Sequence, residues 1–490
     1  MYYMRRTNTI YRDYGEFGYI TDNRNFEYRL LGDNHDFIGD RIVSSIGNIF
    51  LSELARKPIS IDQIVERMHS LFLDTDRETL RNDAIEFYEE LIDAGFVVKG
   101  NTTCECYNNA DQYQRDQSFD EMLDKRENAK KNIVETEEFF GRYFPDGVRL
   151  THLHIEIVSQ CNERCVHCYI PHALKNDMMD KNLFYNILEQ AMDMKVLNLT
   201  ISGGEPMIHP SFVDFLKKSN EYNFSVNILS NLTMLSDEIL NEIKKNPLIS
   251  IQTSIYSMNP EIHDAITCRQ GSWLETIESV LKLKASGVPI QISCPVIQQN
   301  KDEYIDVINW GKEHNIKVNS DYVIIGQYNC SDENLDCRLT YNDVYQYIVR
   351  TVHLNKDYIK HIEKEVGSKN DLTAEDNICS VCRSSICISE RGVAYPCAGW
   401  QNYVLGDLKE TTLENIWNNS EKTQFLRNIK RKDFPQCLVC AQKEFCTMCM
   451  VRNANESSDG NPFEINKYFC KVVELNKEVY QQYKENITNE

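Results

Sequence analysis

Three closely spaced cysteines are the first residues in this chain that could do chemistry. The stretch SQCNERCVHCYIP holds Cys161, Cys165 and Cys168 in CxxxCxxC spacing. A [4Fe–4S] cluster takes four thiolates, so three thiolates would leave one iron open to an outside ligand. Zinc is the alternative, because a distant His152 or His167 could complete a tetrahedral site.

A second motif, ISGGEP, ends at Pro206. Gly203 and Gly204 lack a Cβ and let the backbone approach a ligand closely. The Glu205 carboxylate can accept a hydrogen bond from an ammonium group. The cysteines follow the strand-like run LHIEIVSQ, and this motif closes the next run, LNLTIS. We therefore expect both motifs at carboxyl ends of neighbouring strands, where barrel enzymes carry their active sites.

Together the two motifs resemble the radical S-adenosylmethionine (SAM) enzymes. The resemblance implies that the three cysteines hold a [4Fe–4S] cluster whose open iron binds the amino and carboxyl groups of SAM. One electron then splits SAM to a 5′-deoxyadenosyl radical, which the protein directs at a substrate. The resemblance also implies that the SAM amino group is secured by Gly203, Gly204 and Glu205.

The same resemblance implies four further SAM contacts. The main chain of His167 would lie against the adenine, and Asn231 and Ser254 would reach the ribose or the carboxylate. Ile297, near the end of the fifth strand-like run, would line the adenine site. Ordinary loop capping accounts equally well for Asn231 and Ser254, and a core position accounts equally well for Ile297.

The C-terminal region is rich in cysteine: nine of the 18 cysteines lie between Cys379 and Cys470. Their order, with two CxxC pairs, resembles the SPASM extension of radical SAM maturases, which carries two auxiliary [4Fe–4S] clusters. The resemblance implies that one cluster is held by Cys379, Cys382, Cys397 and Cys449. It implies that the other is held by Cys437, Cys440, Cys446 and Cys470. Zinc knuckles are the alternative for this region.

Some cysteines depart from these patterns. Two residues separate Cys446 from Cys449, where the family often has three. Cys387 is extra and alternates with Ile386 and Ile388 in a short strand, so we interpret it as structural. If Cys387 is instead a ligand, Cys379 is the one it displaces. Plain thiols are expected at Cys104, Cys106, Cys268, Cys294, Cys330 and Cys337.

An alternating pattern of strands and helices carries the first two motifs. Strand-like runs separated by helix-length amphipathic segments are LHIEIV, LNLTIS, FSVNILS, LISIQTSI, VPIQISCPVI and VNSDYVII. This repetition favours parallel strands with right-handed crossovers. The predicted fold class is α/β, with a partial (β/α)6 radical SAM barrel over residues 151–355 and a SPASM domain over residues 356–490.

Residues 1–100 form a separate small unit in this interpretation. Short aromatic strands precede three helices, the last of which stops at Gly95. This winged-helix-like pattern resembles the PqqD-like peptide-recognition domain of many peptide maturases. The resemblance implies that a leader peptide adds a strand beside the sheet edge near FEYRLL, residues 26–31. Residues 101–150 are expected to be a polar linker.

Composition excludes several classes of protein. The 490-residue chain has a formal net charge of −21, which disfavours nucleic acid and anionic lipid as partners. Apolar runs stay well short of the roughly 20 residues of a membrane span, and the N-terminal stretch lacks the apolar core of a signal peptide. We expect a cytoplasmic protein with reduced cysteines.

The sequence therefore favours a radical SAM oxidoreductase that removes a hydrogen from a ribosomally made peptide and forms an intrapeptide thioether. A carbon–carbon crosslink or epimerisation is the alternative. A sulfatase-maturing enzyme is less favoured, because Ala398 follows Cys397 where those enzymes usually carry Asp. A binding or electron-transfer protein would not need SGGEP at a strand end. Expected partners are a precursor peptide and an electron donor of the flavodoxin or ferredoxin type.

Overall fold

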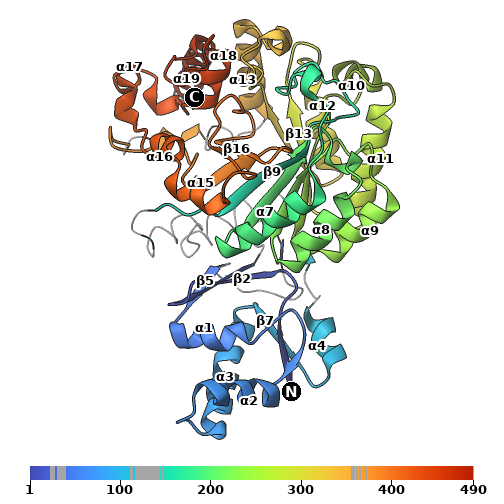
Figure 1. Ribbon diagram of the computed structural model, residues 1–490. Helices are drawn as coiled ribbons and strands as arrows, with labels where there is room; N and C mark the ends of the chain where they lie inside the picture. Colours follow the sequence, from blue (N-terminus) through green and yellow to red (C-terminus); the bar gives the residue numbers. More distant parts are fainter. Residues whose placement is uncertain are drawn as a thin grey trace.

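A computed structural model gives the architecture of the chain. It describes residues 1–22, 40–110, 147–354 and 372–488, with a few positions between them: 28–29, 114–115, 144, 359, 362–363, 366–367 and 369. Figure 1 shows three regions: a small front unit at the bottom, a curved sheet with helices outside it above that unit, and a cysteine-rich C-terminal region beside the sheet. Among the described residues, no helix is long and apolar enough to cross a membrane.

Six parallel strands form the middle region, as the sequence predicts. They are β9 (His152–Val158), β10 (Asn198–Gly203), β11 (Ser225–Leu229), β12 (Ile249–Ser254), β13 (Ile290–Pro295) and β14 (Lys317–Asp321). The helices between them are α7 (Lys181–Asp193), α8 (Phe212–Glu221), α9 (Asp237–Lys245), α10 (Pro260–Thr267), α11 (Ser272–Ala285) and α12 (Tyr304–Glu313). Figure 1 shows these helices along the outside of the sheet.

Side-chain alternation explains why β9 sits in this sheet. Leu153, Ile155 and Ile157 are buried in the main hydrophobic core, together with apolar residues of α7. The alternate residues are polar, and strand side chains point to opposite faces in turn. His152 and His154 meet hydroxyl groups of β10: the ring nitrogens lie 2.8 Å from Thr200 Oγ1 and 2.5 Å from Ser202 Oγ. The concave face of the sheet is therefore polar near β9.

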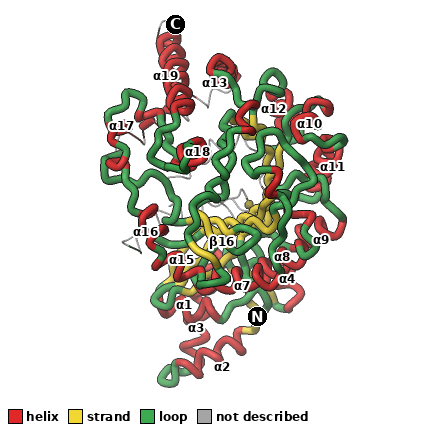
Figure 2. The backbone as a smooth tube through the Cα atoms, turned by 45° about the horizontal axis from the view of Figure 1, so that its top comes forward, coloured by secondary structure: helices red, strands yellow, loops and turns green. Residues whose placement is uncertain are grey.

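The C-terminal region extends the same sheet, which the sequence does not predict. Strand β15 (Ser385–Ile388) pairs in parallel with β9, and β16 (Val393–Tyr395) and β17 (Gly406–Asp407) follow in antiparallel order. The result is one nine-stranded sheet, seen as the continuous yellow band in Figure 2. Around it lie α13 (Tyr341–Leu354), α15 (Leu413–Asn419), α16 (Glu421–Arg427), α17 (Pro435–Leu438), α18 (Met450–Glu456) and α19 (Lys467–Thr488).

The described part of the front unit contains two three-stranded antiparallel sheets and four helices. One sheet joins β1 (Tyr2–Arg5) to β6 (Ile59–Ser60) and β7 (Val97–Gly100). The other joins β3 (Gly18–Asp22) to β2 (Thr9–Asp13) and β5 (Asp40–Val43). The helices are α1 (Ser45–Ser52), α2 (Ile61–Leu71), α3 (Arg77–Asp93) and α4 (Thr103–Ala110).

Local sequence signals account for the helix ends in this unit. Ser60 caps α2 through a capping box with Gln63, and Asp76 caps α3. Gly95 follows α3 with a positive φ of 79°, the left-handed conformation that glycine adopts freely. Helix α4 packs on β7 and β1, although the sequence places residues 101–110 in a linker.

The edge expected to receive a leader peptide lies mostly outside the described residues. Of FEYRLL, only Tyr28–Arg29 is described; it forms β4 and pairs with β8 (Gln114–Arg115). In the described part of the other front sheet, β2 and β5 are the outer strands. Strand β5 is therefore a second candidate edge for an added strand.

A buried arginine joins the front unit to the barrel. Arg12 on β2 is only 2% exposed. Its Nε donates to the Val196 carbonyl at 2.9 Å, and its Nη2 donates to the Asn223 carbonyl at 3.1 Å. Asn223 returns a bond from its side-chain nitrogen to the Thr9 carbonyl at 2.9 Å. Burial lowers the pKa of Arg12 to about 9. This value is still above neutral pH, so the guanidinium keeps its charge there.

We expect Arg12→Met to loosen this joint, because two buried carbonyl groups lose their donors. Buried groups without partners cost about 1–3 kcal/mol each, so scanning calorimetry should show the melting temperature falling by several degrees. Arg41→Met is the control, since Arg41 forms a surface ion pair with Glu90 at 2.9 Å and such pairs contribute little. Equal melting temperatures for the two variants would show that the joint does not depend on Arg12.

Candidate functional site

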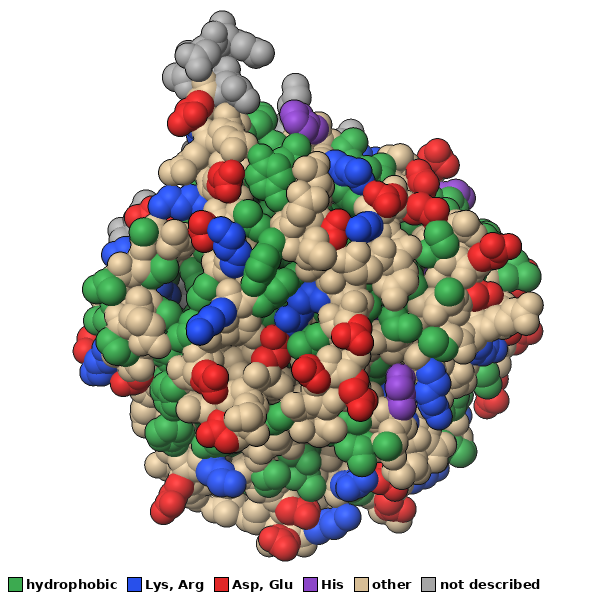
Figure 3. All heavy atoms as spheres, turned by 90° about the horizontal axis from the view of Figure 1, so that it is seen from above, with side chains coloured by type: hydrophobic (Ala, Val, Ile, Leu, Met, Phe, Trp, Pro, Cys, Tyr) green, Lys and Arg blue, Asp and Glu red, His purple; other side chains and the backbone are tan. Residues whose placement is uncertain are grey.

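A cavity of about 270 Å³ lies at the carboxyl ends of the barrel strands. The cysteine loop after β9 forms one wall, and the ends of β10, β11 and β12 form the others. All three motif cysteines line it: Cys161, Cys165 and Cys168. Figure 3 views the molecule from above, and basic and acidic side chains are interspersed on that face.

Backbone hydrogen bonds hold the cysteine loop against the corner between α10 and α11. The Arg164 amide donates to the Thr267 carbonyl at 2.9 Å, and the Val166 amide donates to the Ile266 carbonyl at 3.0 Å. Within the loop, the Cys168 amide donates to the Cys165 carbonyl at 3.2 Å. These bonds fix the loop independently of any ligand.

The chemistry of the three thiols fits an iron–sulfur cluster. Burial raises the pKa of Cys161 to about 11, and it raises that of Cys165 well above its usual value. The Glu163 carboxylate and the neighbouring thiols add repulsion that raises the pKa of Cys165 further. Thiolates grouped in this way need a strong positive centre to balance their charge, and iron supplies it.

Gly203 and Gly204 line the cavity as expected, but they also serve the packing of two strands. Gly203 has φ 131°, and a Cβ there would lie 1.8 Å from the Val158 carbonyl oxygen. A Cβ at Gly204 would lie 2.1 Å from the Gln160 carbonyl oxygen. Only glycine lets the end of β10 approach the start of the cysteine loop this closely.

Glu205 does not face the cavity, in contrast to the expectation that it contacts SAM. Its side chain is fully buried and accepts three hydrogen bonds: from the Met207 amide at 2.9 Å, the Ser230 hydroxyl at 2.8 Å and the Asn231 amide at 2.7 Å. The carboxylate is therefore committed to fixing the loop after β11. Burial raises its pKa to about 7 despite these bonds.

Two other expected SAM contacts, Asn231 and Ser254, do line the cavity. The Asn231 side chain donates to Asn162 Oδ1 at 2.9 Å and accepts from the Thr233 hydroxyl at 2.8 Å, so it ties its loop to the cysteine loop. Ser254 ends β12 and faces the cavity.

His167 lines the cavity, whereas Ile297 does not. The His167 ring is buried against Tyr256, with Nε2 3.3 Å from the Tyr256 hydroxyl, and burial lowers its pKa to about 4. Its carbonyl accepts from the Asn334 side chain at 3.1 Å. Ile297 is fully buried in a satellite core with Tyr256, so the structure gives it the core position that the sequence left open.

Two charged residues of the cavity were missed by the sequence analysis. Glu163 is 4% exposed, and no hydrogen bond reaches its Oε1 in the part of the chain that the structure describes. Lys175 is 7% exposed, and no hydrogen bond or ion pair of its ammonium group is found among the described residues. Glu163 could have been noticed as a charge inside the cysteine motif, but Lys175 has no local signal.

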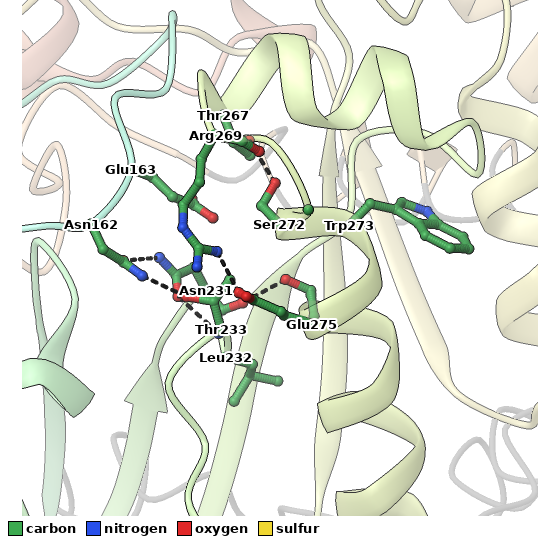
Figure 4. Close-up of polar contacts among 12 residues, drawn as sticks. Asn162, Glu163, Asn231, Leu232, Thr233, Thr267, Arg269, Ser272, Trp273 and Glu275 are labelled. Atoms are coloured by element: carbon green, nitrogen blue, oxygen red, sulfur yellow. Dashed lines mark hydrogen bonds and ion pairs between the residues drawn. The ribbon is translucent and has the colours of Figure 1, made fainter.

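Arg269, in the corner between α10 and α11, lies near Glu163 of the cysteine loop. Figure 4 shows its side chain between Glu163 and Glu275, above Asn231. Nη1 donates to Glu275 Oε2 at 2.5 Å. Burial raises the pKa of Glu163 to about 7, although the positive charge of Arg269 lowers it. Asp264 fixes the corner between α10 and α11 by accepting from the Gly271 and Trp273 amides and from the Ser272 hydroxyl.

Charge repulsion relates the thiols of the C-terminal region in two sets, and the members of each set are cysteines that the resemblance assigns to one cluster. In the first, burial raises the pKa of Cys379 to about 11 and of Cys382 to about 12, and repulsion links Cys379 to Cys397, Cys449 and Cys382. In the second, burial raises the pKa of Cys437 to about 11, and repulsion adds to it from Cys446, Cys470 and Cys440. Among the described residues, no three Cys, His, Asp or Glu side chains are placed to hold a single metal ion.

The remaining cysteines lie apart from these groups. Cys387 is buried on β15, where it pairs with His154 of β9 and Tyr395 of β16. Cys330 accepts from Asn402 at 3.1 Å. Of the others, Cys106, Cys294 and Cys337 are buried, and Cys104 and Cys268 are exposed.

Comparison with known families matches two parts of the chain. Residues 155–328 match the family described as the Radical SAM superfamily. Residues 379–442 match the family described as SPASM, an iron–sulfur cluster-binding domain. The matched ranges contain the cysteine loop with its cavity and most of the C-terminal cysteines.

Two relatives share about a quarter of their aligned residues with this chain. The tungsten-containing aldehyde ferredoxin oxidoreductase cofactor-modifying protein of Pyrococcus furiosus is 24% identical over 330 residues, which is 61% of this chain and 89% of that protein. The antilisterial bacteriocin subtilosin biosynthesis protein AlbA of Bacillus subtilis is 24% identical over 320 residues, 62% of this chain and 68% of that protein.

A solved structure resembles nearly the whole chain. SuiB of Streptococcus suis, crystallised with its precursor peptide SuiA, superposes with a TM-score of 0.58 over 95% of this chain and 99% of that one. The sequence identity is 15%, so this likeness concerns the fold. The matched families, the thiol-lined cavity and the two further cysteine groups agree: the chain is an enzyme that contains a radical SAM domain followed by a SPASM iron–sulfur cluster-binding domain.

Proposed function

We propose that this enzyme is a maturase of a ribosomally synthesised peptide and that it forms an intrapeptide thioether between a cysteine sulfur and a carbon. The observation that carries the proposal is the cavity at the strand ends, where three thiols lie beside two glycines and a pair of buried opposite charges. Two further cysteine groups in the C-terminal region supply redox capacity beyond what SAM cleavage alone requires.

The residues that would hold SAM are those of the cavity. Cys161, Cys165 and Cys168 would bind the [4Fe–4S] cluster, and the SAM bound to it supplies a hydrogen-abstracting 5′-deoxyadenosyl radical. Glu163 and Lys175 are both more than nine-tenths buried, and they carry the opposite charges that an amino-acid zwitterion needs. We assign the SAM amino group to Glu163, in place of Glu205, and the SAM carboxylate to Lys175.

A peptide substrate is supported by the relatives and by the front unit. AlbA is named for subtilosin biosynthesis, and SuiB was crystallised with a precursor peptide. The front unit, which the likeness to SuiB includes, offers the outer strand β5 for an added strand of a leader peptide. Recognition would therefore occur in the front unit and chemistry at the strand ends of the barrel.

The bond type is the least constrained part of the proposal. A carbon–carbon crosslink uses the same hydrogen abstraction and the same two-electron balance, and epimerisation needs no net oxidation. Anaerobic sulfatase maturation is less favoured, because Ala398 places no carboxylate directly after Cys397. We place the thioether first by the resemblance of the whole domain arrangement to thioether-forming maturases.

The electron balance of the proposed reaction suggests a role for the C-terminal cysteines. Closing a crosslink removes two hydrogens from the peptide: one leaves as an atom, and the other leaves as a proton and an electron. The two four-cysteine groups would hold the clusters that receive this electron. A separate electron donor of the flavodoxin or ferredoxin type would reduce the cluster of the three-cysteine loop.

Replacing the three loop cysteines together by Ala should abolish SAM cleavage and lower the iron content from about twelve to about eight atoms per chain. The loss is limited because the loop shares no cysteine with the other two groups. Iron quantitation after anaerobic reconstitution measures this. Cys268→Ser is the control, since Cys268 is exposed and outside all three groups. About four iron atoms in the unmodified enzyme would remove the auxiliary clusters from the proposal.

Lys175→Met should weaken SAM binding at least tenfold, because a charged hydrogen bond contributes about 1.5–3 kcal/mol. Calorimetric titration of the reconstituted enzyme with SAM measures the change, and Lys175→Arg should keep most of the affinity. Lys181→Met is a matched control, since Lys181 lies outside the cavity and pairs with Asp214 at 2.6 Å. Unchanged SAM affinity in Lys175→Met, at normal iron content, would rule out the carboxylate assignment.

The product tests the reaction itself. Incubating the reduced enzyme with SAM and a cysteine-containing precursor should give a peptide lighter by two hydrogen atoms per crosslink, with 5′-deoxyadenosine alongside. Mass spectrometry after treatment with a thiol-alkylating agent should show one cysteine per crosslink protected, because its sulfur is bonded to carbon.

Three other outcomes would change the assignment. A lighter peptide whose cysteines all still alkylate indicates a carbon–carbon crosslink. An unchanged mass in ordinary water, with deuterium incorporated at an α-carbon in heavy water, indicates epimerisation. A precursor without its leader should be modified much more slowly, and equal rates would exclude the front unit from recognition.

A further inference from the structure

A buried carboxylate lies between the SAM cavity and the first group of C-terminal cysteines. Glu156 on β9 is 2% exposed, and each of its oxygens accepts one side-chain hydrogen bond. The Tyr169 hydroxyl donates to Oε1 at 2.8 Å, and the Gln401 side-chain nitrogen donates to Oε2. The two donors come from loops that are far apart in the sequence.

Each donor belongs to a loop that carries cluster cysteines. Tyr169 directly follows Cys168 and lines the SAM cavity. Gln401 lies four residues after Cys397 on the segment that follows β16. Glu156 itself is on the strand that pairs with both β10 and β15. One carboxylate therefore links the loop of the SAM cavity to the loop of the first four-cysteine group.

Because Glu156 is buried, losing either of its two hydrogen bonds is costly. A buried carboxylate is costly unless its oxygens are hydrogen-bonded, and burial raises the pKa of Glu156 to about 8 although both bonds oppose the shift. Losing either donor leaves a buried acceptor without a partner. Displacement of either loop is therefore resisted, because it breaks a bond that no water replaces cheaply at this depth.

We infer that Glu156 is a positioning residue that fixes the SAM cavity relative to the cysteine group containing Cys397, so that peptide oxidation is coupled to SAM cleavage. The inference rests on the proposed function. When the crosslink closes, the peptide loses one proton and one electron, and the electron must reach an oxidised cluster of the C-terminal region before the peptide intermediate is quenched. A loosened link would let SAM cleavage continue while fewer crosslinks form.

Gln401→Met tests the inference with little change in shape. Met has no hydrogen-bond donor, so Glu156 Oε2 loses its partner while the bond from Tyr169 to Oε1 stays. We expect SAM cleavage and iron content close to those of the unmodified enzyme, and a several-fold lower ratio of crosslinked peptide to 5′-deoxyadenosine. Glu242→Gln is the control, because Glu242 is a buried carboxylate on α9 that pairs with Lys245 at 3.1 Å.

Gln401→Glu places two carboxylates together, and the double variant Glu156→Gln with Gln401→Glu restores the bond with donor and acceptor exchanged. Recovery of the coupling ratio in the double variant supports positioning, because a general loss of stability would not be repaired by a second substitution. An unchanged ratio in Gln401→Met overturns the inference, and so does a parallel fall of iron, SAM cleavage and crosslink, since that indicates a structural role only.

A second measurement does not depend on the peptide product. In the reduced holoenzyme without peptide, electron paramagnetic resonance reports the magnetic interaction between neighbouring clusters. Gln401→Met should alter that interaction at unchanged iron content, and the double variant should keep it as in the unmodified enzyme. Identical spectra of Gln401→Met and the unmodified enzyme would overturn the inference. If the unmodified enzyme yields 5′-deoxyadenosine but no crosslink, the proposed function fails, and this spectroscopic comparison still decides the role of Glu156.

Discussion

The pairing of β9 on both of its edges is the constraint on which the rest of the site depends. One edge pairs in parallel with β10 and the other with β15, so a single strand sets the register of the barrel and of the C-terminal region. The cysteine loop begins where β9 ends, and Gly203 packs on Val158 at the same point. A parallel ladder covered by side chains on both faces resists slippage, because a shift of one residue exchanges the two faces. The loops of the SAM cavity and of the first four-cysteine group are consequently attached to one continuous sheet.

The sequence predicts local structure and the cysteine motifs well, because both depend on short-range patterns. The six barrel strands and the capping of α2 at Ser60 follow from periodicity and from cap chemistry. The parallel pairing of β15 with β9 has no such signal, since Ser385–Ile388 is short and its partner is distant in the chain. The joint at Arg12 is hidden for the same reason: its acceptors are backbone carbonyls, which every residue carries. Long-range pairing of this kind is decided by packing of the whole molecule.

The candidate site shows the same division between backbone and side chains. The sequence places Gly203 and Gly204 correctly at the cavity, because a motif at a strand end fixes where the backbone passes. It cannot say where a carboxylate finds its donors, and Glu205 finds one in its own segment, at the Met207 amide, and two in the loop after β11. Ile297 lies in a satellite core with Tyr256 and Ile324, and its place in that core depends on residues far apart in the sequence. Lys175 reaches the cavity only through the fold of the loop that follows the cysteines.

The buried side chains of Glu163 and Lys175 bear on what the cavity can bind. Glu163 and Lys175 are both buried, yet in the described structure they do not form an ion pair with each other. Oε1 of Glu163 accepts no hydrogen bond in the described structure, although the Arg269 charge lies nearby, and a buried charge that is not fully paired is costly. The loop nevertheless holds its shape, because the backbone bonds to Thr267 and Ile266 and the bond between Asn231 and Asn162 do not depend on those charges. In the proposed binding of SAM, its ammonium would offer a partner to Glu163 and its carboxylate would offer one to Lys175. Because the loop is already held by backbone bonds, this binding would need no large rearrangement, which is a condition for tight binding.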